Sequence, residues 1–131
     1  MADNKGVMII AEVLDGKLAS ISKELLGAGS KLAKDLGEPL SAVIIGEGVA
    51  GIAPEAIAQG ADKVYVIDDA LLKDYRTDAY VAVIEKAVAL ANPRIILAGQ
   101  TTIGRDLAPR LAFRLNSAAT LDCVDLAKPN Q

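Results

Sequence analysis

The stretch Arg94–Asn116, RIILAGQTTIGRDLAPRLAFRLN, decides the fold expected for this chain. It opens with the apolar run Ile95–Ala98, which is typical of a buried parallel strand. A small, hydroxyl-rich turn follows over Gly99–Gly104, and leucines then recur every four residues, as on one face of a helix. The pattern therefore predicts a strand, a loop and a helix in direct succession. In an open α/β sheet such a loop lies at the carboxyl end of its strand, where ligands usually bind.

The same alternation of short apolar runs and amphipathic segments fills the rest of the chain. We expect strands at 6–12, 40–45, 64–67 and 95–98, a fifth strand or departing linker at 118–126, and helices at 21–36, 52–58, 77–91 and after the Gly99 turn. We expect Ser20 to cap the first long helix and Thr77 or Asp78 to cap the third. Short connections allow only right-handed βαβ crossovers. The fold class predicted is a Rossmann-like α/β three-layer sandwich with a mostly parallel sheet, in the strand order 3-2-1-4-5.

Composition bounds the organisation and the classes of function. The 131 residues are expected to form one α/β domain over 1–127 with a polar tail over 128–131. A net charge of −3 with 3% aromatic residues argues against nucleic-acid binding. Histidine is absent and Cys123 stands alone, so neither an intrachain disulfide nor a cysteine metal cluster can form. No apolar run is long enough to span a bilayer and no leader is recognisable, so we expect a cytoplasmic, bacterial protein that is not membrane-embedded.

A glycine-rich loop over Gly46–Gly51 follows the second expected strand. Its sequence, GEGVAG, fits the spacing of a dinucleotide-binding fingerprint, and Asp68 ends the next strand, near where a ribose-binding acid would stand. The loop follows the second strand instead of the first, and Glu47 puts a negative charge where pyrophosphate would lie. A tight turn that needs the conformational freedom of glycine explains the same residues.

The loop over Gly99–Gly104 is the better candidate for binding an anion. Its candidate binding residues are Gly99, Thr101, Thr102, Gly104 and Arg105. Two hydroxyls, a cationic side chain and the N–H groups of a helix start would all favour phosphate. The spacing is that of a phosphate-binding P-loop, but an Arg-Asp pair replaces the usual Lys-Ser/Thr.

The same residues have a structural explanation. Thr101, Thr102 and Asp106 could cap the following helix, with Arg105 paired to a nearby carboxylate. Pro109 would then lie in the first turn if Asp106 is the N-cap, whereas a helix that starts at Thr102 should kink at this proline.

No catalytic constellation is visible in the sequence. Neither a His-paired nucleophile nor an obvious carboxylate pair in one pocket is present. The acidic groups that a metal could use are Asp68-Asp69, Asp122 and Asp125, and acids at strand ends are more often solvated turn residues than ligands. We therefore predict neither catalytic nor metal-binding residues.

The run Gly99–Ala112, GQTTIGRDLAPRLA, resembles the signature of the electron-transfer flavoprotein alpha subunit, near the end of its N-terminal domain. The resemblance covers essentially the whole chain. It implies a sandwich of the adenine nucleotide alpha-hydrolase-like type and a non-catalytic scaffold and subunit-interface domain. The intact family members are alpha–beta heterodimers that carry electrons from flavin dehydrogenases, such as the acyl-CoA dehydrogenases of fatty acid oxidation, to a quinone oxidoreductase or other acceptor.

The resemblance also implies where the cofactor lies. FAD is expected mainly in the C-terminal domain of the alpha subunit, which this chain lacks, so we expect an excised domain or a truncated product that binds no FAD. In the family's beta subunit the corresponding crevice holds AMP or a second flavin. In this chain AMP is expected to bind weakly at most. The isolated domain is expected to self-associate or to bind a beta subunit.

Two other functions remain open at this stage. One is a stand-alone nucleotide-binding module of the universal-stress type, although its later Gly-rich phosphate loop is not found. The other is a small dinucleotide-dependent enzyme that uses Gly46–Gly51.

Overall fold

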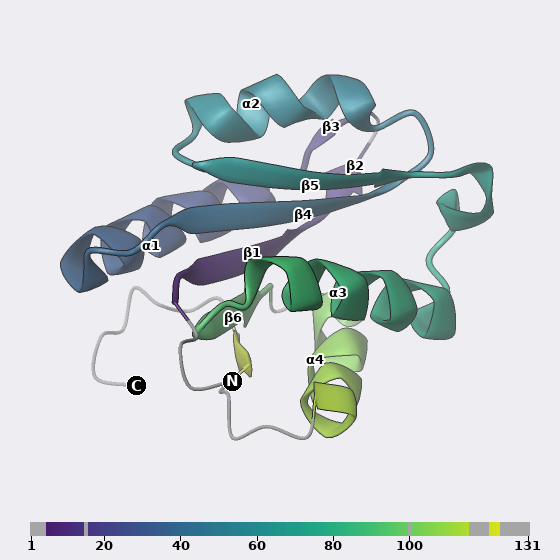
Figure 1. The fold of residues 1–131 in the computed structure, drawn as a ribbon. Helices are drawn as coiled ribbons and strands as arrows, with labels where there is room; N and C mark the ends of the chain where they lie inside the picture. The colour runs from purple at the N-terminus through teal and green to yellow at the C-terminus, as the bar shows by residue number, and fades with distance from the viewer. Residues whose placement is uncertain (1–4, 15, 100, 116–120, 124–131) are drawn as a thin grey trace.

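A five-stranded parallel sheet forms the centre of the computed structural model (Figure 1), which describes residues 5–14, 16–99, 101–115 and 121–123. The strands follow the order β5-β4-β1-β6-β7, which confirms the predicted order 3-2-1-4-5. Their bounds are β1 Val7–Ala11, β4 Leu40–Gly46, β5 Lys63–Asp68, β6 Ile95–Ala98 and β7 Leu121–Cys123. β7 pairs in parallel with β6, so the last segment contains the fifth strand and is not merely a linker.

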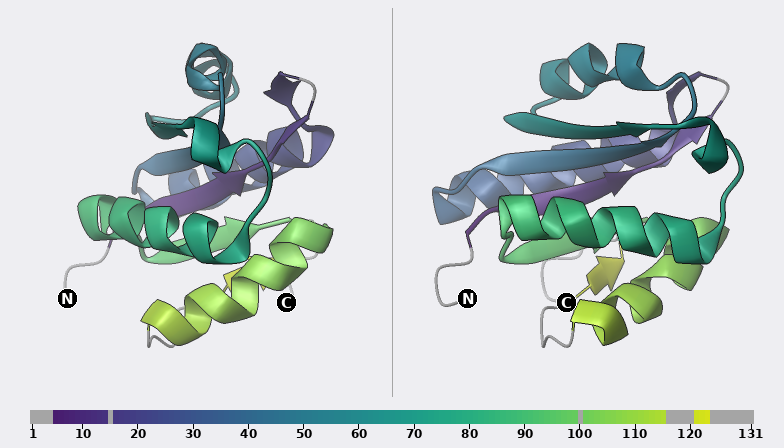
Figure 2. Two further views of the ribbon diagram at one scale, coloured as in Figure 1. Left: turned by 90° about the vertical axis from the view of Figure 1, so that its right-hand side faces the viewer. Right: turned by 45° about the vertical axis from the view of Figure 1, so that its right-hand side comes forward.

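Helices cover both faces of the sheet (Figure 2), which confirms the three-layer sandwich. One face packs against α1 (Ser20–Leu36) and α2 (Ala53–Ala58), and the other against α3 (Thr77–Ala91) and α4 (Thr102–Leu115). The division follows from right-handed crossovers, which change face when the chain passes from one side of β1 to the other. None of these helices is long and apolar enough to cross a membrane, within the part of the chain that the structure describes.

The central strand β1 is buried on both faces because every one of its side chains is apolar. Val7 and Ile9 point into the core beneath α1, whereas Met8 and Ile10 point into the core beneath α3 and α4. All four side chains are at most 4% exposed. The apolar run that predicted the strand is therefore the seam between two hydrophobic cores.

Helices α1 and α3 end at Leu36 and Ala91, as predicted, but their predicted N-terminal caps are not observed. Gly37 and Asn92 adopt the left-handed conformation that closes α1 and α3. The predicted caps are wrong: Ser20 and Thr77 are the first helical residues, and no side chain caps either helix. Hydroxyl residues are common at an N-cap, but here the chain places them one residue inside the helix.

The start of α4 decides between the two alternatives that the sequence left open. The helix begins at Thr102, so Asp106 is not its N-cap and Pro109 lies inside the helix instead of in the first turn. Proline has no N–H and cannot donate to the carbonyl four residues earlier. The helix therefore lacks one backbone hydrogen bond at Pro109.

A small hairpin follows β1, in a segment for which no strand was predicted. Its strands are β2 (Val13–Leu14) and β3 (Lys17–Leu18), paired antiparallel. Two single 3-10 turns, η1 (Ala50–Ile52) and η2 (Ala70–Leu72), were also not predicted. All three short elements lie at the carboxyl ends of strands, so they shape the edge where the candidate loops lie.

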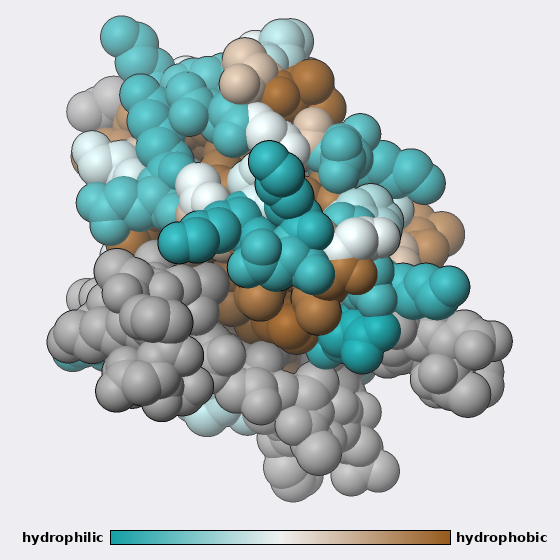
Figure 3. Space-filling view, turned by 90° about the vertical axis from the view of Figure 1, so that its left-hand side faces the viewer, coloured by the Kyte–Doolittle hydropathy of each residue, from teal (hydrophilic) through white to brown (hydrophobic). Residues whose placement is uncertain are grey.

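A bidentate ion pair joins two loops at the amino ends of the strands. Arg94 Nη2 lies 2.6 Å from Glu38 Oε2, and the backbone N–H of Gly6 donates to Glu38 Oε1 at 2.7 Å. The Arg94 hydrogen bond and then the Gly6 N–H lower the pKa of the Glu38 carboxyl. Figure 3 shows this end of the molecule, where hydrophilic residues lie above and to the right of a group of hydrophobic ones. The pair ties the start of β1 to the starts of its neighbours β4 and β6.

Candidate functional site

The Gly46–Gly51 loop holds a carboxylate of the chain itself. Asp68, the last residue of β5, accepts the backbone N–H of Gly48 at 2.8 Å, of Val49 at 3.0 Å and of Ala50 at 3.1 Å. These hydrogen bonds, that from Gly48 above all, lower the pKa of the Asp68 carboxyl. The loop therefore has the geometry of an anion site, but its donors are already used.

This arrangement reinterprets the dinucleotide fingerprint. In a dinucleotide fold these N–H groups would contact pyrophosphate, and the acid of the next strand would bind ribose. Here the acid at that place binds the loop. A pyrophosphate would have to displace Asp68 and would also meet Glu47, which is exposed in the same loop. The residues present do not fit a dinucleotide.

The Gly99 loop follows β6, which pairs with β1 on the side opposite to β4. The strand order of the sheet reverses at this point, where ligands usually bind in such folds. The Thr101 hydroxyl donates to Glu12 Oε2 at 2.5 Å, from a residue 89 positions earlier in the chain. Gly99 is buried, and a side chain there would meet Ile21 Cγ1 at 2.7 Å. A carboxylate therefore stands beside this loop as well, in the place where the sequence had predicted an anion.

Glu12 is held in place by the first helix. The buried Ser22 hydroxyl donates to the Glu12 carbonyl at 2.7 Å and accepts the Glu12 N–H at 2.6 Å. The chain is thus fixed at the residue directly after β1, which turns the half-buried Glu12 side chain toward Thr101. The sequence analysis placed Glu12 inside the first strand and missed this role. Its position at the end of the central strand, beside the reversal point, was the available signal.

The other predicted residues of the Gly99 loop are less involved. Arg105 is exposed and has no ion pair with any residue that the structure describes, so its predicted carboxylate partner is not found there. Its backbone N–H bonds to the Thr101 carbonyl at 2.8 Å in the first turn of α4. Thr102 and Gly104 belong to the same helix start, and the structure describes only their backbone.

Asp106 connects α4 to the start of α3. It accepts hydrogen bonds from the hydroxyls of Tyr75 at 2.6 Å and Thr77 at 2.5 Å, and Arg110 lies 3.6 Å away on the next turn. The Thr77 and Tyr75 hydrogen bonds lower the pKa of the Asp106 carboxyl. Burial, and then the bond to Asp106, raises the pKa of Tyr75 to about 12. The acid expected to cap its own helix instead joins two helices.

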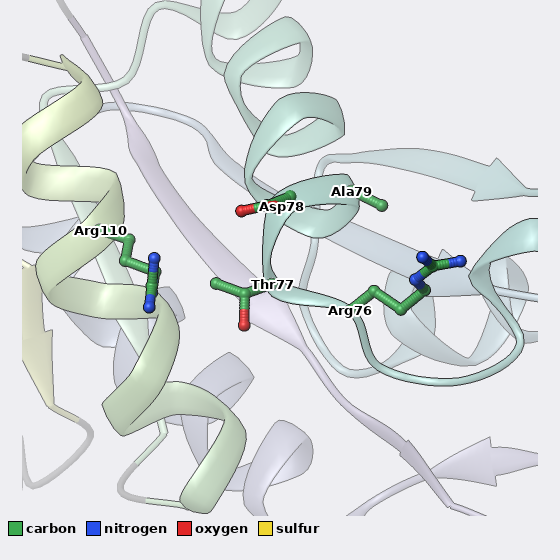
Figure 4. A pocket seen from close by; sticks show the side chains of 5 residues that line it. All are labelled: Arg76, Thr77, Asp78, Ala79 and Arg110. Atoms are coloured by element: carbon green, nitrogen blue, oxygen red, sulfur yellow. The ribbon is translucent and has the colours of Figure 1, made fainter.

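A shallow hollow lies beside this junction (Figure 4) and is lined by Arg76, Thr77, Asp78, Ala79 and Arg110. In Figure 4, Arg110 lies beside Thr77 while Arg76 extends away on the other side of the helix start. The two guanidinium groups do not converge, and Asp78 adds a negative charge. The hollow is therefore not built as an anion site.

A second hollow, of about 140 Å³, lies between the ends of β1 and β4. Ligand pockets usually measure roughly 300–1,000 Å³, so this one is small for a nucleotide. Glu12 and Glu47 line it together with Lys73. Within the described ranges, no group of three or more potential metal ligands is present. Asp122 and Asp125, two of the acids considered in the sequence, lie outside the described side chains.

Comparison with known structures identifies the fold. The universal stress protein from Archaeoglobus fulgidus, solved in complex with dAMP, superposes with a TM-score of 0.57 over 91% of this chain and 96% of its own. The two sequences are only 14% identical, so the likeness concerns the fold alone. It agrees with the predicted Rossmann-like sandwich of the adenine nucleotide alpha-hydrolase-like type.

Comparison of sequences identifies the family. The electron transfer flavoprotein alpha subunit of Megasphaera elsdenii is 45% identical over 126 residues, which are 96% of this chain and 37% of that protein. The acryloyl-CoA reductase electron transfer subunit beta of Anaerotignum propionicum is 43% identical over 93% of this chain and 33% of its own length. The chain thus spans about a third of the length of these relatives. Because the family model of the electron transfer flavoprotein domain matches residues 7–130, the chain belongs to that family, as its Gly99–Ala112 signature predicted.

Proposed function

We propose that this chain serves as the N-terminal scaffold and subunit-interface domain of an electron transfer flavoprotein alpha subunit, in a heterodimer with a beta subunit. One observation supports a non-catalytic role above all. Each strand-end loop that could hold a phosphate is already next to a carboxylate of the chain, Asp68 in one and Glu12 in the other. A domain that satisfies its own anion sites is suited to support a flavin site built elsewhere.

FAD and AMP are both poor fits to the described residues. A phosphate at the Gly46 loop would compete with three N–H bonds to Asp68, and one at the Gly99 loop would face Glu12. The hollow between them is small for an adenosine group. We therefore assign the FAD of the intact heterodimer to a C-terminal domain of the alpha subunit, and no step of electron transfer to this chain.

The heterodimer would carry electrons from flavin dehydrogenases, such as acyl-CoA dehydrogenases, to a quinone oxidoreductase or other acceptor. The name of the Anaerotignum propionicum relative, which links it to acryloyl-CoA reductase, supports an acyl-CoA partner for the family. A place in fatty acid oxidation and a cytoplasmic location remain part of this proposal.

Absorbance and co-purification test the proposal together. The purified chain should show no flavin absorbance and should form a complex with the beta subunit of its own organism. Stoichiometric FAD in the chain alone would place the flavin site in this domain. Failure to bind the beta subunit, with the chain correctly folded by circular dichroism, would contradict the interface role.

A further inference from the structure

The hollow at the carboxyl end of the sheet has an apolar floor. Ile10, Ile45 and Leu107 form part of its lining, and each is at most 5% exposed. Val13 and Ile103, both half-buried, form part of its wall. A volume of about 140 Å³ holds only four or five waters at roughly 30 Å³ each. An apolar side chain that displaces them would bury its surface against this floor, which favours binding.

Two exposed leucines stand beside this hollow. Leu14, in the small hairpin, follows Val13 of the hollow wall, and Leu71 lies in η2, two residues before Lys73 of the rim. Their side chains are 66% and 74% exposed. Exposed leucines in two short elements that adjoin the hollow along the chain give the end of the sheet the features of a protein contact instead of a solvated edge.

The rim of the hollow is acidic. Among the described lining residues, Glu12 and Glu47 are acidic and Lys73 is the one cation. Asp69 and Asp74 lie near Lys73 along the chain. Within the described part of the chain, no salt bridge neutralises Glu47 or Lys73. A partner that complements this rim carries a positive charge next to the group that enters the hollow.

We propose that this carboxyl-end surface, formed by the hollow with Leu14, Leu71 and Glu47, is where the beta subunit docks. The occupant is a segment that places one aliphatic side chain in the hollow and an adjacent lysine or arginine against Glu47. The size of the hollow fits a side chain better than a nucleotide. The inference rests on the proposed heterodimer and assigns its contact to one end of the sheet.

The opposite end of the sheet supplies matched controls. Leu90, near the end of α3, is 76% exposed, slightly more than Leu71 at 74%. Asp35, near the end of α1, is exposed like Glu47 and has no ion pair among the described residues. Because helices α1 and α3 end where the strands begin, both controls lie away from the hollow (Figure 1).

The test is a titration of the 131-residue chain with the purified beta subunit of its own organism, followed by calorimetry. Leu14→Ser, Leu71→Ser and Glu47→Lys should each weaken binding about tenfold, the effect typical of a central interface residue. Leu90→Ser and Asp35→Lys should change it less than twofold. All five variants should keep the melting temperature of the wild type, because every substituted side chain is exposed.

Each other outcome has a definite meaning. If the beta subunit binds the wild type and all carboxyl-end variants equally, the docking surface is wrong and the proposed function stands. If only Leu90→Ser or Asp35→Lys weakens binding, the contact lies at the amino end and the inference is overturned. If the folded wild type does not bind at all, the heterodimer role fails and the docking surface fails with it.

Discussion

The two glycine-rich loops at the carboxyl ends of β4 and β6 look alike in sequence but hold their carboxylates by different means. In the Gly46 loop, Asp68 accepts three backbone N–H groups from consecutive residues. In the Gly99 loop, Glu12 accepts one side-chain hydroxyl, that of Thr101. The first loop is therefore closed by main-chain donors, whereas at the second the carboxylate is bound by a side-chain hydroxyl. Glycine spacing alone does not tell whether a ligand or the chain itself supplies the anion.

Among these changes, overpacking at Gly99 should have the largest effect on the unfolding free energy. Changing Gly99→Ala puts a methyl group 2.7 Å from Ile21 Cγ1, so Ile21 or the loop must shift. Overpacking of this kind costs about 1–3 kcal/mol of unfolding free energy, measured by urea denaturation. The control is Gly51→Ala in the other loop, where no heavy atom lies within 4 Å of the added methyl group. It should be neutral or slightly stabilising, and equal losses in both variants would contradict the packing argument.

Loss of the Thr101 hydroxyl contact at the Gly99 loop should have the second largest effect on the unfolding free energy. Thr101→Val keeps the shape of the side chain but removes the donor to Glu12. One such hydrogen bond contributes about 1 kcal/mol to the unfolding free energy. A double-mutant cycle with Glu12→Gln isolates the pair, since the cost of Thr101→Val should fall when the charge is absent. A cost that is the same in both backgrounds would show that Glu12 and Thr101 are not coupled.

The exposed carboxylate of the Gly46 loop should have a smaller effect that depends on pH. Asp68→Asn removes the charge that Gly48, Val49 and Ala50 stabilise. Because folding lowers the pKa of Asp68 below its ordinary value of 3.8, its contribution is fully present above that value. It is lost as the pH falls through the lower pKa of the folded state. The wild type should therefore be more stable than Asp68→Asn at pH 7, with the difference shrinking below pH 3.8; a difference that grows on acidification would contradict this sign.

The sequence predicted the sheet well because its strands are continuous apolar runs, such as Val7–Ala11, and because short crossovers leave few topologies. It predicted the helix ends at Gly37 and Asn92, where the left-handed conformation favours particular residues. Helix starts were wrong, because a hydroxyl such as that of Thr77 can bond elsewhere, here to Asp106. Local sequence patterns do not predict hydrogen-bond partners that are distant in the chain.

The candidate site was harder to predict for the same reason. Asp68 was noticed at its strand end, but as a ligand for ribose instead of for the chain's own loop. Glu12 was missed, since its contact with Thr101 joins residues 89 positions apart. The charge argument, which favours the Gly99 loop over the Gly46 loop for an anion, stays a prediction that rests on exposed Arg105 and exposed Glu47. What it lacked was the carboxylate that tertiary structure brings to the second loop.

The smallest effects are expected on the affinity for AMP. They show directly which of the two loops binds the nucleotide. AMP titrated by calorimetry should bind the chain only weakly, since Asp68 fills one loop and Glu12 repels phosphate at the other. Arg105→Ala should weaken this binding, and Glu12→Gln should strengthen it, each by roughly two- to fivefold, the range of an exposed charge pair.

Other results would assign AMP to different functions. Tight binding abolished by Arg105→Ala would favour a nucleotide-binding module at the Gly99 loop over a scaffold. Tight binding that is unchanged by Arg105→Ala but lost in Gly48→Val would assign the nucleotide to the Gly46 loop. Gly48→Val disturbs that loop because Gly48 has a φ of 69°, which valine adopts only with strain. AMP in the Gly46 loop would have to replace Asp68 on three backbone N–H groups, so Asp68→Asn should then strengthen AMP binding. If AMP binds at the Gly99 loop instead, Asp68→Asn should leave its affinity unchanged. The response to Asp68→Asn therefore identifies the loop even where Gly48→Val disturbs the fold.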